Sequence, residues 1–210
     1  FEKKRKGAQL SKIETEKFQT ELLLFLGKAY HKLGWIQQFH LGAMRNNNTR
    51  MFNKLGPDTG WDSIGSYSIA NGLSRYLDTL DTEDQLTKTI LYNLNPADNE
   101  IMATMIGNFN DGSTKGKIQW GSGWWFLDQL DGMKDQINIL SNMGLISCFI
   151  GMLTDSRSFL SFPRHEYFRR LVCNLFGNDI EKGILPQDMK LIGGIIQDIC
   201  YNNAKCYFNY

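Results

Sequence analysis

Apolar residues recur at helical spacing in the first part of the chain. Ser11 and Glu14 have the spacing of a capping box, in which the serine accepts a free backbone N–H and the glutamate reaches back to the cap. Apolar positions then follow at helical spacing, and Gly34 comes after them as a helix stop. They are Ile13, Phe18, Leu22, Phe25, Leu26, Ala29, Tyr30 and Leu33. The pattern predicts one long leading helix in residues 1–33.

Short apolar runs further along the chain alternate with helical patterns. The runs predict four strands, at Trp35–Leu41, Thr89–Leu94, Lys117–Trp120 and Cys148–Leu153. The segment Gly42–Gly65 is rich in Gly, Asn, Pro and Asp, and it predicts a long loop. Helices are expected over Ile69–Leu80, Asn95–Ile106, Gly132–Met143, Arg164–Phe176 and Gln187–Phe208.

Strands that alternate with helices predict an α/β fold with a parallel sheet and right-handed crossovers. No linker or change of composition divides the chain, so we expect a single domain over residues 1–210. A complete eight-stranded barrel takes about 250 residues, so four strands fit either a small open domain or half a barrel. Polar or aromatic residues follow every predicted strand: His40, Asn95, Trp124 with Trp125, and Asp155. This favours half a barrel, because an open sheet binds ligands mainly at one switch point.

The composition narrows the range of partners. There are 23 basic and 22 acidic side chains, and a net charge of +1 gives no general attraction for nucleic acid or anionic lipid. No apolar stretch approaches the roughly 18 residues of a membrane span, and the first residues lack the apolar core of a signal peptide. The four cysteines form no C-x-x-C pair, which indicates buried thiols in a reducing compartment. We therefore expect a cytoplasmic protein that binds neither nucleic acid nor membrane.

His40, Asp155 and His165 are candidates for metal binding or proton transfer. A histidine or carboxylate at a strand end can bind a metal or carry a proton. Each also has an ordinary interpretation, because His40 could be a hydrogen-bonded strand terminus and Asp155 a helix cap. His165 stands in the first turn of a predicted helix, where it faces either the mouth of the barrel or the surface.

Arginines near the strand ends could bind a carboxylate, and tryptophans there could bind a sugar ring. Arg45, Arg50 and Arg157 would supply guanidinium forks for a carboxylate, although each could also serve an ordinary ion pair. Trp124 and Trp125 would stack on the C–H faces of a sugar ring, or simply pack under a loop. The chain has no dinucleotide fingerprint, phosphate-binding loop or serine elbow.

Several long motifs together resemble those of the uronate isomerases, a family of metal-dependent barrels related to the amidohydrolases. The longest, WIQQFHLGAMRNNNTRMF at Trp35–Phe52, is similar to the family signature that follows the fifth barrel strand. The similarity extends from about Gly34 to the end of the chain. Its further motifs lie at Leu55–Gly60, Asp62–Gly65, Asp98–Phe109, Gly121–Phe126, Met152–Phe159 and Arg164–Arg170.

The resemblance implies the C-terminal half of a TIM (β/α)8 barrel, with strands five to eight in residues 34–160 and final helices in 161–210. It implies interconversion of D-glucuronate with D-fructuronate, and of D-galacturonate with D-tagaturonate, in hexuronate catabolism. Asp155 would be a metal ligand and the proton-handling carboxylate, and His40 a second ligand. The metal would be divalent, with zinc expected. The substrate would be held by Arg45, Arg157, Trp124, Trp125 and His165.

The sequence departs from the family in two places. Ser66 stands where the family usually has an acidic residue. The family's His-x-His metal pair follows the first strand, and none occurs among the three histidines here. We therefore expect a fragment whose partner is the N-terminal half of the barrel, with a homo-oligomer left open. Two alternatives are an inactive carbohydrate-binding or assembly piece and a metal-dependent hydrolase on the same barrel.

Overall fold

The first long element is the predicted helix with its predicted cap. The computed structural model describes residues 1–210, and a short helix α1 (Glu2–Arg5) precedes α2 (Lys12–Leu33). The backbone N–H of Glu14 donates to Ser11 Oγ at 3.2 Å, and the Ser11 N–H donates to the Glu14 carboxylate at 2.8 Å. Gly34, with a φ of +68°, ends the helix in the left-handed conformation that glycine adopts freely. The capping box and the stop are both confirmed.

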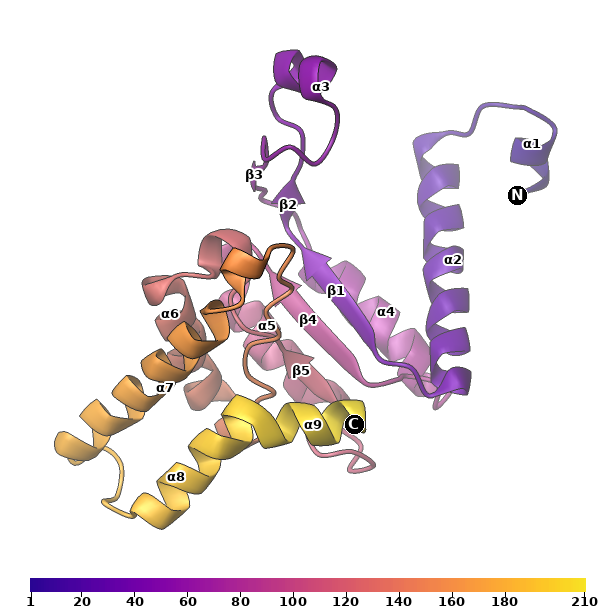
Figure 1. Ribbon diagram of the computed structural model, residues 1–210. Coiled ribbons are helices and arrows are strands. Elements are labelled where there is room, and N and C mark those ends of the chain that lie inside the picture. The colour runs from indigo at the N-terminus through magenta and orange to yellow at the C-terminus, as the bar shows by residue number, and fades with distance from the viewer.

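A three-stranded parallel sheet forms the centre of the molecule, in the order β1–β4–β5 (Figure 1). The strands are β1 (Gln37–Leu41), β4 (Thr89–Asn93) and β5 (Ile118–Trp120), which confirms three predicted strands to within two residues at each end. β4 is buried along its whole length, as expected of a central strand covered on both faces. The α/β class and the parallel sheet are therefore as predicted.

The predicted fourth strand, Cys148–Leu153, is wrong. A 3-10 turn, η4 (Ile146–Cys148), enters this segment, and the residues after it form no strand. The side chain of Gln119 takes the place of a backbone ladder, because its Nε2 donates to the Cys148 carbonyl at 3.0 Å and its Oε1 accepts the Ile150 N–H at 3.3 Å. Gly151 then turns the chain with a φ of +69°, which an extended strand does not permit.

The predicted loop Gly42–Gly65 contains regular structure. Its ends pair as a short antiparallel hairpin of β2 (Ala43–Met44) and β3 (Ser63–Ile64), with helix α3 (Thr49–Leu55) between them. The side-chain oxygen of Asn48 caps α3 by accepting the Met51 N–H at 3.1 Å. The hairpin extends away from the carboxyl end of β1 (Figure 1). Segments this short lie below the length at which hydrophobic periodicity predicts an element.

In Figure 1, α2 and α4 lie together near β1, where they contact each other, and α6, α7 and α8 lie on the opposite side of the sheet. The predicted helix Gln187–Phe208 is interrupted by a π-helical turn, η6. None of the helices is both long and apolar enough to cross a membrane. The remaining elements are α4 (Ala70–Thr82), η1 (Pro96–Asp98), α5 (Asn99–Met105), η2 (Ile106–Phe109), η3 (Trp125–Leu127), α6 (Leu130–Met143), η5 (Phe159–Ser161), α7 (Arg164–Glu181), α8 (Met189–Gln197), η6 (Asp198–Asn202) and α9 (Asn203–Phe208).

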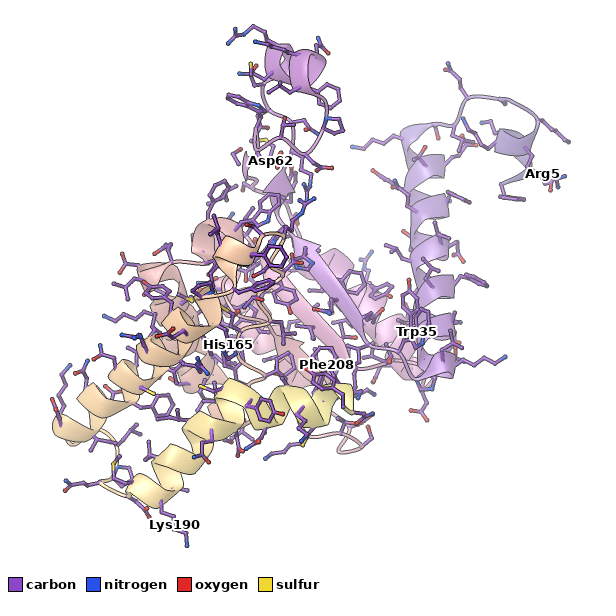
Figure 2. The ribbon with its side chains drawn as sticks, in the orientation of Figure 1. Arg5, Trp35, Asp62, His165, Lys190 and Phe208 are labelled. Carbon is purple, nitrogen blue, oxygen red and sulfur yellow. The ribbon has the colours of Figure 1, made fainter.

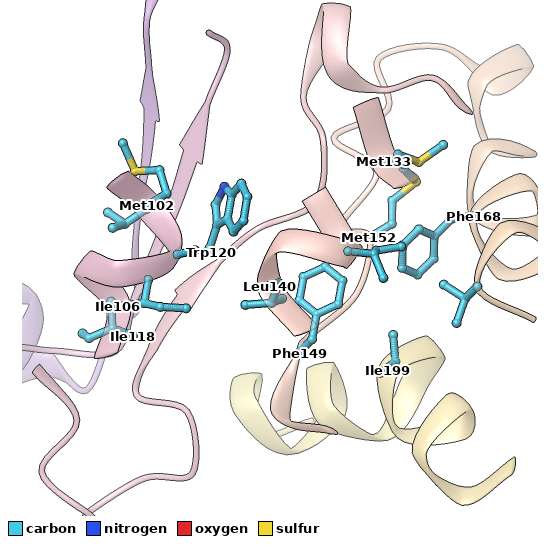
Figure 3. Close-up of a cluster of buried hydrophobic side chains, with 14 of the residues drawn as sticks. Met102, Ile106, Ile118, Trp120, Met133, Leu140, Phe149, Met152, Phe168 and Ile199 are labelled. Carbon is cyan, nitrogen blue, oxygen red and sulfur yellow. The ribbon is translucent and has the colours of Figure 1, made fainter. Parts of the chain in front are cut away.

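Two buried clusters lie on the two faces of β4, because successive side chains of a strand point to opposite faces. Leu91 belongs to the larger cluster, which joins the sheet to α4, α5, α6 and α7 and includes Trp120, Phe149 and Phe168 (Figure 3). Ile90 and Tyr92 belong to the smaller cluster, whose other members are Leu94, Trp124, Ile150 and Tyr207. The face of the smaller cluster is the one that bears the candidate site.

Candidate active site

One cavity of about 510 Å³ gathers most of the predicted site residues. It lies against the β4 face that carries Tyr92, and it is lined by strand residues, the loop after β5, the segment after Gly151 and the C-terminal residues. Five of the seven predicted site residues line it: His40, Trp124, Trp125, Asp155 and Arg157. Residues from β1, from the loop after β5 and from the segment after the fourth apolar run therefore meet at one place.

The imidazole of His40 packs against two aromatic rings, although the residue keeps an exposed side. Parallel pairing sets it directly opposite Tyr92, and the two rings stack with centroids 4.5 Å apart and planes 5° apart. The Trp124 indole meets the imidazole edge-on at 4.7 Å. Desolvation by this packing lowers the pKa of His40 below its usual 6.5, and the charge of Arg45 lowers it further, whereas Asp155 raises it. His40 is therefore neutral at pH 7, the form that binds a metal or accepts a proton.

Tyr92 supports His40 and was not predicted as a site residue. Its hydroxyl donates to Gln38 Oε1 at 2.9 Å. Burial raises the pKa of Tyr92 above its ordinary value of 10, and the negative charge of Asp155 acts in the same direction. The phenol therefore stays protonated at neutral pH and serves as a stacking surface and hydrogen-bond donor. The continuous apolar run of this buried strand gives no sign of this role.

Asp155 and Trp125 have backbone conformations that are unusual for their residue types. Their φ angles are +46° and +49°, in the left-handed region. Aspartate tolerates this region, but a bulky residue such as tryptophan seldom adopts it. Such conformations cost about 1–3 kcal/mol and gather at functional sites. Asp155 and Arg157 are both exposed where they line the cavity, so both can meet a ligand from solvent.

Arg45 and His165 lie outside this cavity. The Arg45 guanidinium stacks over the Trp125 ring at 4.7 Å and forms ion pairs with Asp58 at 3.2 Å and Asp62 at 3.7 Å. Figure 2 shows Asp62 on the hairpin beyond the sheet, so the two ion pairs lie within the hairpin. The stacking of Arg45 on Trp125, which lines the cavity, joins the hairpin to the rim of the cavity. His165 lines a smaller adjoining cavity, and burial together with the charge of Arg169 lowers its pKa. Their proposed contacts with substrate stay predictions.

An ion pair in the cavity wall was also missed. Asp128 and Arg164 both line the cavity, and Nη1 of Arg164 donates to the Asp128 carboxylate. The Asp128 side chain is only 7% exposed, and its burial raises its pKa, although the Arg164 charge opposes the rise. The two residues are 36 positions apart in the sequence, so no local pattern connects them.

The donors at the cavity fit a divalent metal only in part. An imidazole and a carboxylate, from His40 and Asp155, are suitable ligand types. The chain contains no group of three or more His, Cys, Asp or Glu side chains that could hold a metal ion. A catalytic zinc site usually has three protein ligands, so residues 1–210 supply an incomplete set.

Comparison with known proteins gives one consistent result. The family model described as glucuronate isomerase matches residues 1–208, so the similarity begins well before Gly34. A uronate isomerase of Flavobacterium johnsoniae is 67% identical over all 210 residues, and the match covers 45% of that protein's length. A uronate isomerase of Phocaeicola vulgatus is 58% identical over the whole of this chain, and the match again covers 45% of the relative. The crystal structure of uronate isomerase from Thermotoga maritima has a TM-score of 0.86 and 32% identity, covering 96% of this chain and 43% of that chain. The chain thus spans less than half the length of these relatives.

Proposed function

The chain belongs to the glucuronate isomerase family, and we propose that it forms the carboxylate-bearing part of a uronate isomerase active site. The substrates would be the open-chain forms of D-glucuronate and D-galacturonate, and the products D-fructuronate and D-tagaturonate. In this isomerisation a proton leaves C2 and one arrives at C1. The C2 hydroxyl loses its proton to become a carbonyl, and the C1 aldehyde oxygen gains one to become a hydroxyl.

The observation that carries the proposal is the content of the cavity. A carboxylate, a neutral imidazole, a guanidinium and two indoles line one space of about 510 Å³, within the size of small-molecule sites. We assign the transfer of the proton from C2 to C1 to Asp155, because it is the exposed carboxylate of this cavity. His40, neutral at pH 7, would lie beside it as a ligand or supporting group.

The remaining groups would recognise the sugar acid. Arg157 would bind the uronate carboxylate in a bidentate manner, which suits the planar guanidinium. The indoles of Trp124 and Trp125 would face the apolar C–H groups of the sugar chain. Arg45 and His165 would reach the substrate only from the rim and from the adjoining cavity, respectively.

A divalent metal, with zinc proposed, would be held in part by Asp155 and His40. When bound, it would polarise the substrate oxygens and favour loss of the C2 proton. The missing ligands would come from the N-terminal half of an eight-stranded barrel, with this sheet as part of its strands five to eight. We propose a cytoplasmic setting, which the four free cysteines support.

Isomerisation in heavy water tests this function in the full-length protein that contains these residues. Proton NMR should show D-glucuronate and D-galacturonate converting to their ketoses, with deuterium entering at C1 when the transferred proton exchanges with solvent. D-glucose, which lacks the carboxylate, is the matched control and should react far more slowly. Absence of ketose formation from both uronates by folded, metal-supplemented protein would contradict the proposal.

A further inference from the structure

Arg164 joins two separate loops of the cavity wall. It is the first residue of α7, and its Nη1 donates to the carboxylate of Asp128 in the loop that follows β5. Its Nη2 donates to the Thr154 carbonyl and to Ser156 Oγ, the latter at 3.3 Å. The Ser156 hydroxyl in turn donates to the Ser161 carbonyl at 3.3 Å. One half-buried guanidinium thus connects the loop after β5 with the segment Thr154–Ser156.

The contacts of Arg164 lie on either side of Asp155. Neither the side chain nor the backbone of Asp155 makes a hydrogen bond within the chain, and its φ of +46° is intrinsically disfavoured. Within the chain, the polar contacts that hold this stretch are therefore those that Arg164 makes to the two residues flanking Asp155. Asp128 anchors the guanidinium from the other loop, in which Trp124 and Trp125 also stand.

We propose that Arg164, anchored by Asp128, is a positioning residue that sets the direction of the Asp155 carboxylate. The catalytic consequence rests on the proposed isomerase function, whereas the positioning itself does not. The planar guanidinium directs its N–H groups to Asp128 and to Thr154 at once. A lysine at position 164 would keep the charge beside Asp128 but could not reproduce this fork, so the arginine is required for more than charge.

Two readouts in the full-length protein separate local positioning from general stability. Trypsin cleaves after Arg157, which is exposed and directly follows the segment Thr154–Ser156, so the rate of this cut reports how often the segment opens. Arg164→Gln should raise the rate of cleavage after Arg157 about tenfold over the rates at other sites. With D-glucuronate it should lower kcat by about ten- to a hundredfold and change KM less than about twofold. Arg164→Lys should give intermediate values for both.

Two further variants sharpen the test. Arg170→Gln removes an exposed ion pair with Glu166 on the same helix, and it should leave the cleavage after Arg157 and the kinetics unchanged. Arg164→Gln should also lower the melting temperature, because it breaks the pair with Asp128. The charge swap Asp128→Arg with Arg164→Asp should bring the melting temperature back, whereas kcat should stay low and cleavage after Arg157 should stay fast. The reason is that a carboxylate at position 164 cannot donate to the Thr154 carbonyl.

Several outcomes would overturn the positioning role. One is a rate of cleavage after Arg157 that stays unchanged in Arg164→Gln and Arg164→Lys. Another is cleavage that becomes faster at all trypsin sites alike in these variants. The third is recovery of kcat in the charge-swapped protein. If the unaltered protein does not isomerise uronates, the proposed function fails. The cleavage rates then still decide whether Arg164 holds the Asp155 segment.

Discussion

Asp155 occupies a backbone conformation that few residue types accept, and asparagine is one of them. Asparagine also tolerates the left-handed region, so Asp155→Asn should keep the fold while it removes the charge. In the full-length protein we expect turnover of D-glucuronate to fall at least about a hundredfold, the scale of losing a positioned acid–base group. Steady-state kinetics near those of the unaltered protein would remove Asp155 from the mechanism.

Arg157 should matter for binding more than for turnover. Arg157→Lys keeps the positive charge but loses the bidentate fork, so KM for D-glucuronate should rise about tenfold, the effect of one charge-assisted hydrogen bond of about 1.5 kcal/mol. Arg75→Lys on the exposed side of α4 is the control, and it should change nothing. Unchanged kinetics of Arg157→Lys with glucuronate would contradict its contact with the carboxylate.

The pKa of His40 depends on two charges of opposite effect. Arg45 lowers it and Asp155 raises it, in addition to the dominant lowering by desolvation. Arg45→Gln should therefore move the NMR titration midpoint of the His40 ring protons upward, and Asp155→Asn should move it downward. Shifts of the opposite sign would show that the two charges do not face His40 as described.

At the residue scale, the sequence predicts the polar and aromatic groups at the ends of apolar runs but not the partners of these groups. His40, Asp155 and the two tryptophans follow apolar runs, so their common location could be predicted from strand alternation. The support from Tyr92 and the Asp128–Arg164 pair depends on contacts between distant segments. Spacing along the chain carries no information about such contacts.

At the element scale, the apolar run Cys148–Leu153 shows where periodicity misleads. Its composition is that of a buried strand, yet Gln119 and Gly151 decide its conformation. Capped helices and the three strands of the parallel sheet were predictable because each has both a pattern and a boundary signal. The hairpin with α3 was not, since its strands have two residues each.

Gly151 should be intolerant of any side chain. A Cβ there would lie 2.1 Å from the Ile199 carbonyl oxygen, and the φ of +69° disfavours other residues. We expect Gly151→Ala to lower the free energy of unfolding by about 2–4 kcal/mol, from overpacking and backbone strain together. Gly193→Ala in α8, where a Cβ would meet nothing within 4 Å, should instead raise it by about 0.5–1 kcal/mol. Equal urea midpoints for the two variants would refute this account of the turn.

At the scale of the whole molecule, apolar surface remains uncovered. Ile13, Phe25 and Leu33 on α2 are 60–68% exposed, and β1 pairs on one edge only. Exposed apolar side chains and an open strand edge promote association. Residues 1–210 alone should therefore self-associate in light scattering and bind zinc only weakly, since His40 and Asp155 offer at most two ligands.

The central claim, that these residues form part of a shared isomerase site, is tested most directly by complementation. Residues 1–210 would be combined with the part of the Flavobacterium johnsoniae relative that they do not cover; this relative is 67% identical over the present chain, which spans 45% of its length. Conversion of D-glucuronate would then be measured with zinc present. Neither piece should be active alone, and the mixture of the two should form ketose. A mixture made with the Asp155→Asn variant of residues 1–210 should not. Chelator-sensitive turnover by residues 1–210 alone, or a stable but inactive complex of the two unaltered pieces, would contradict it.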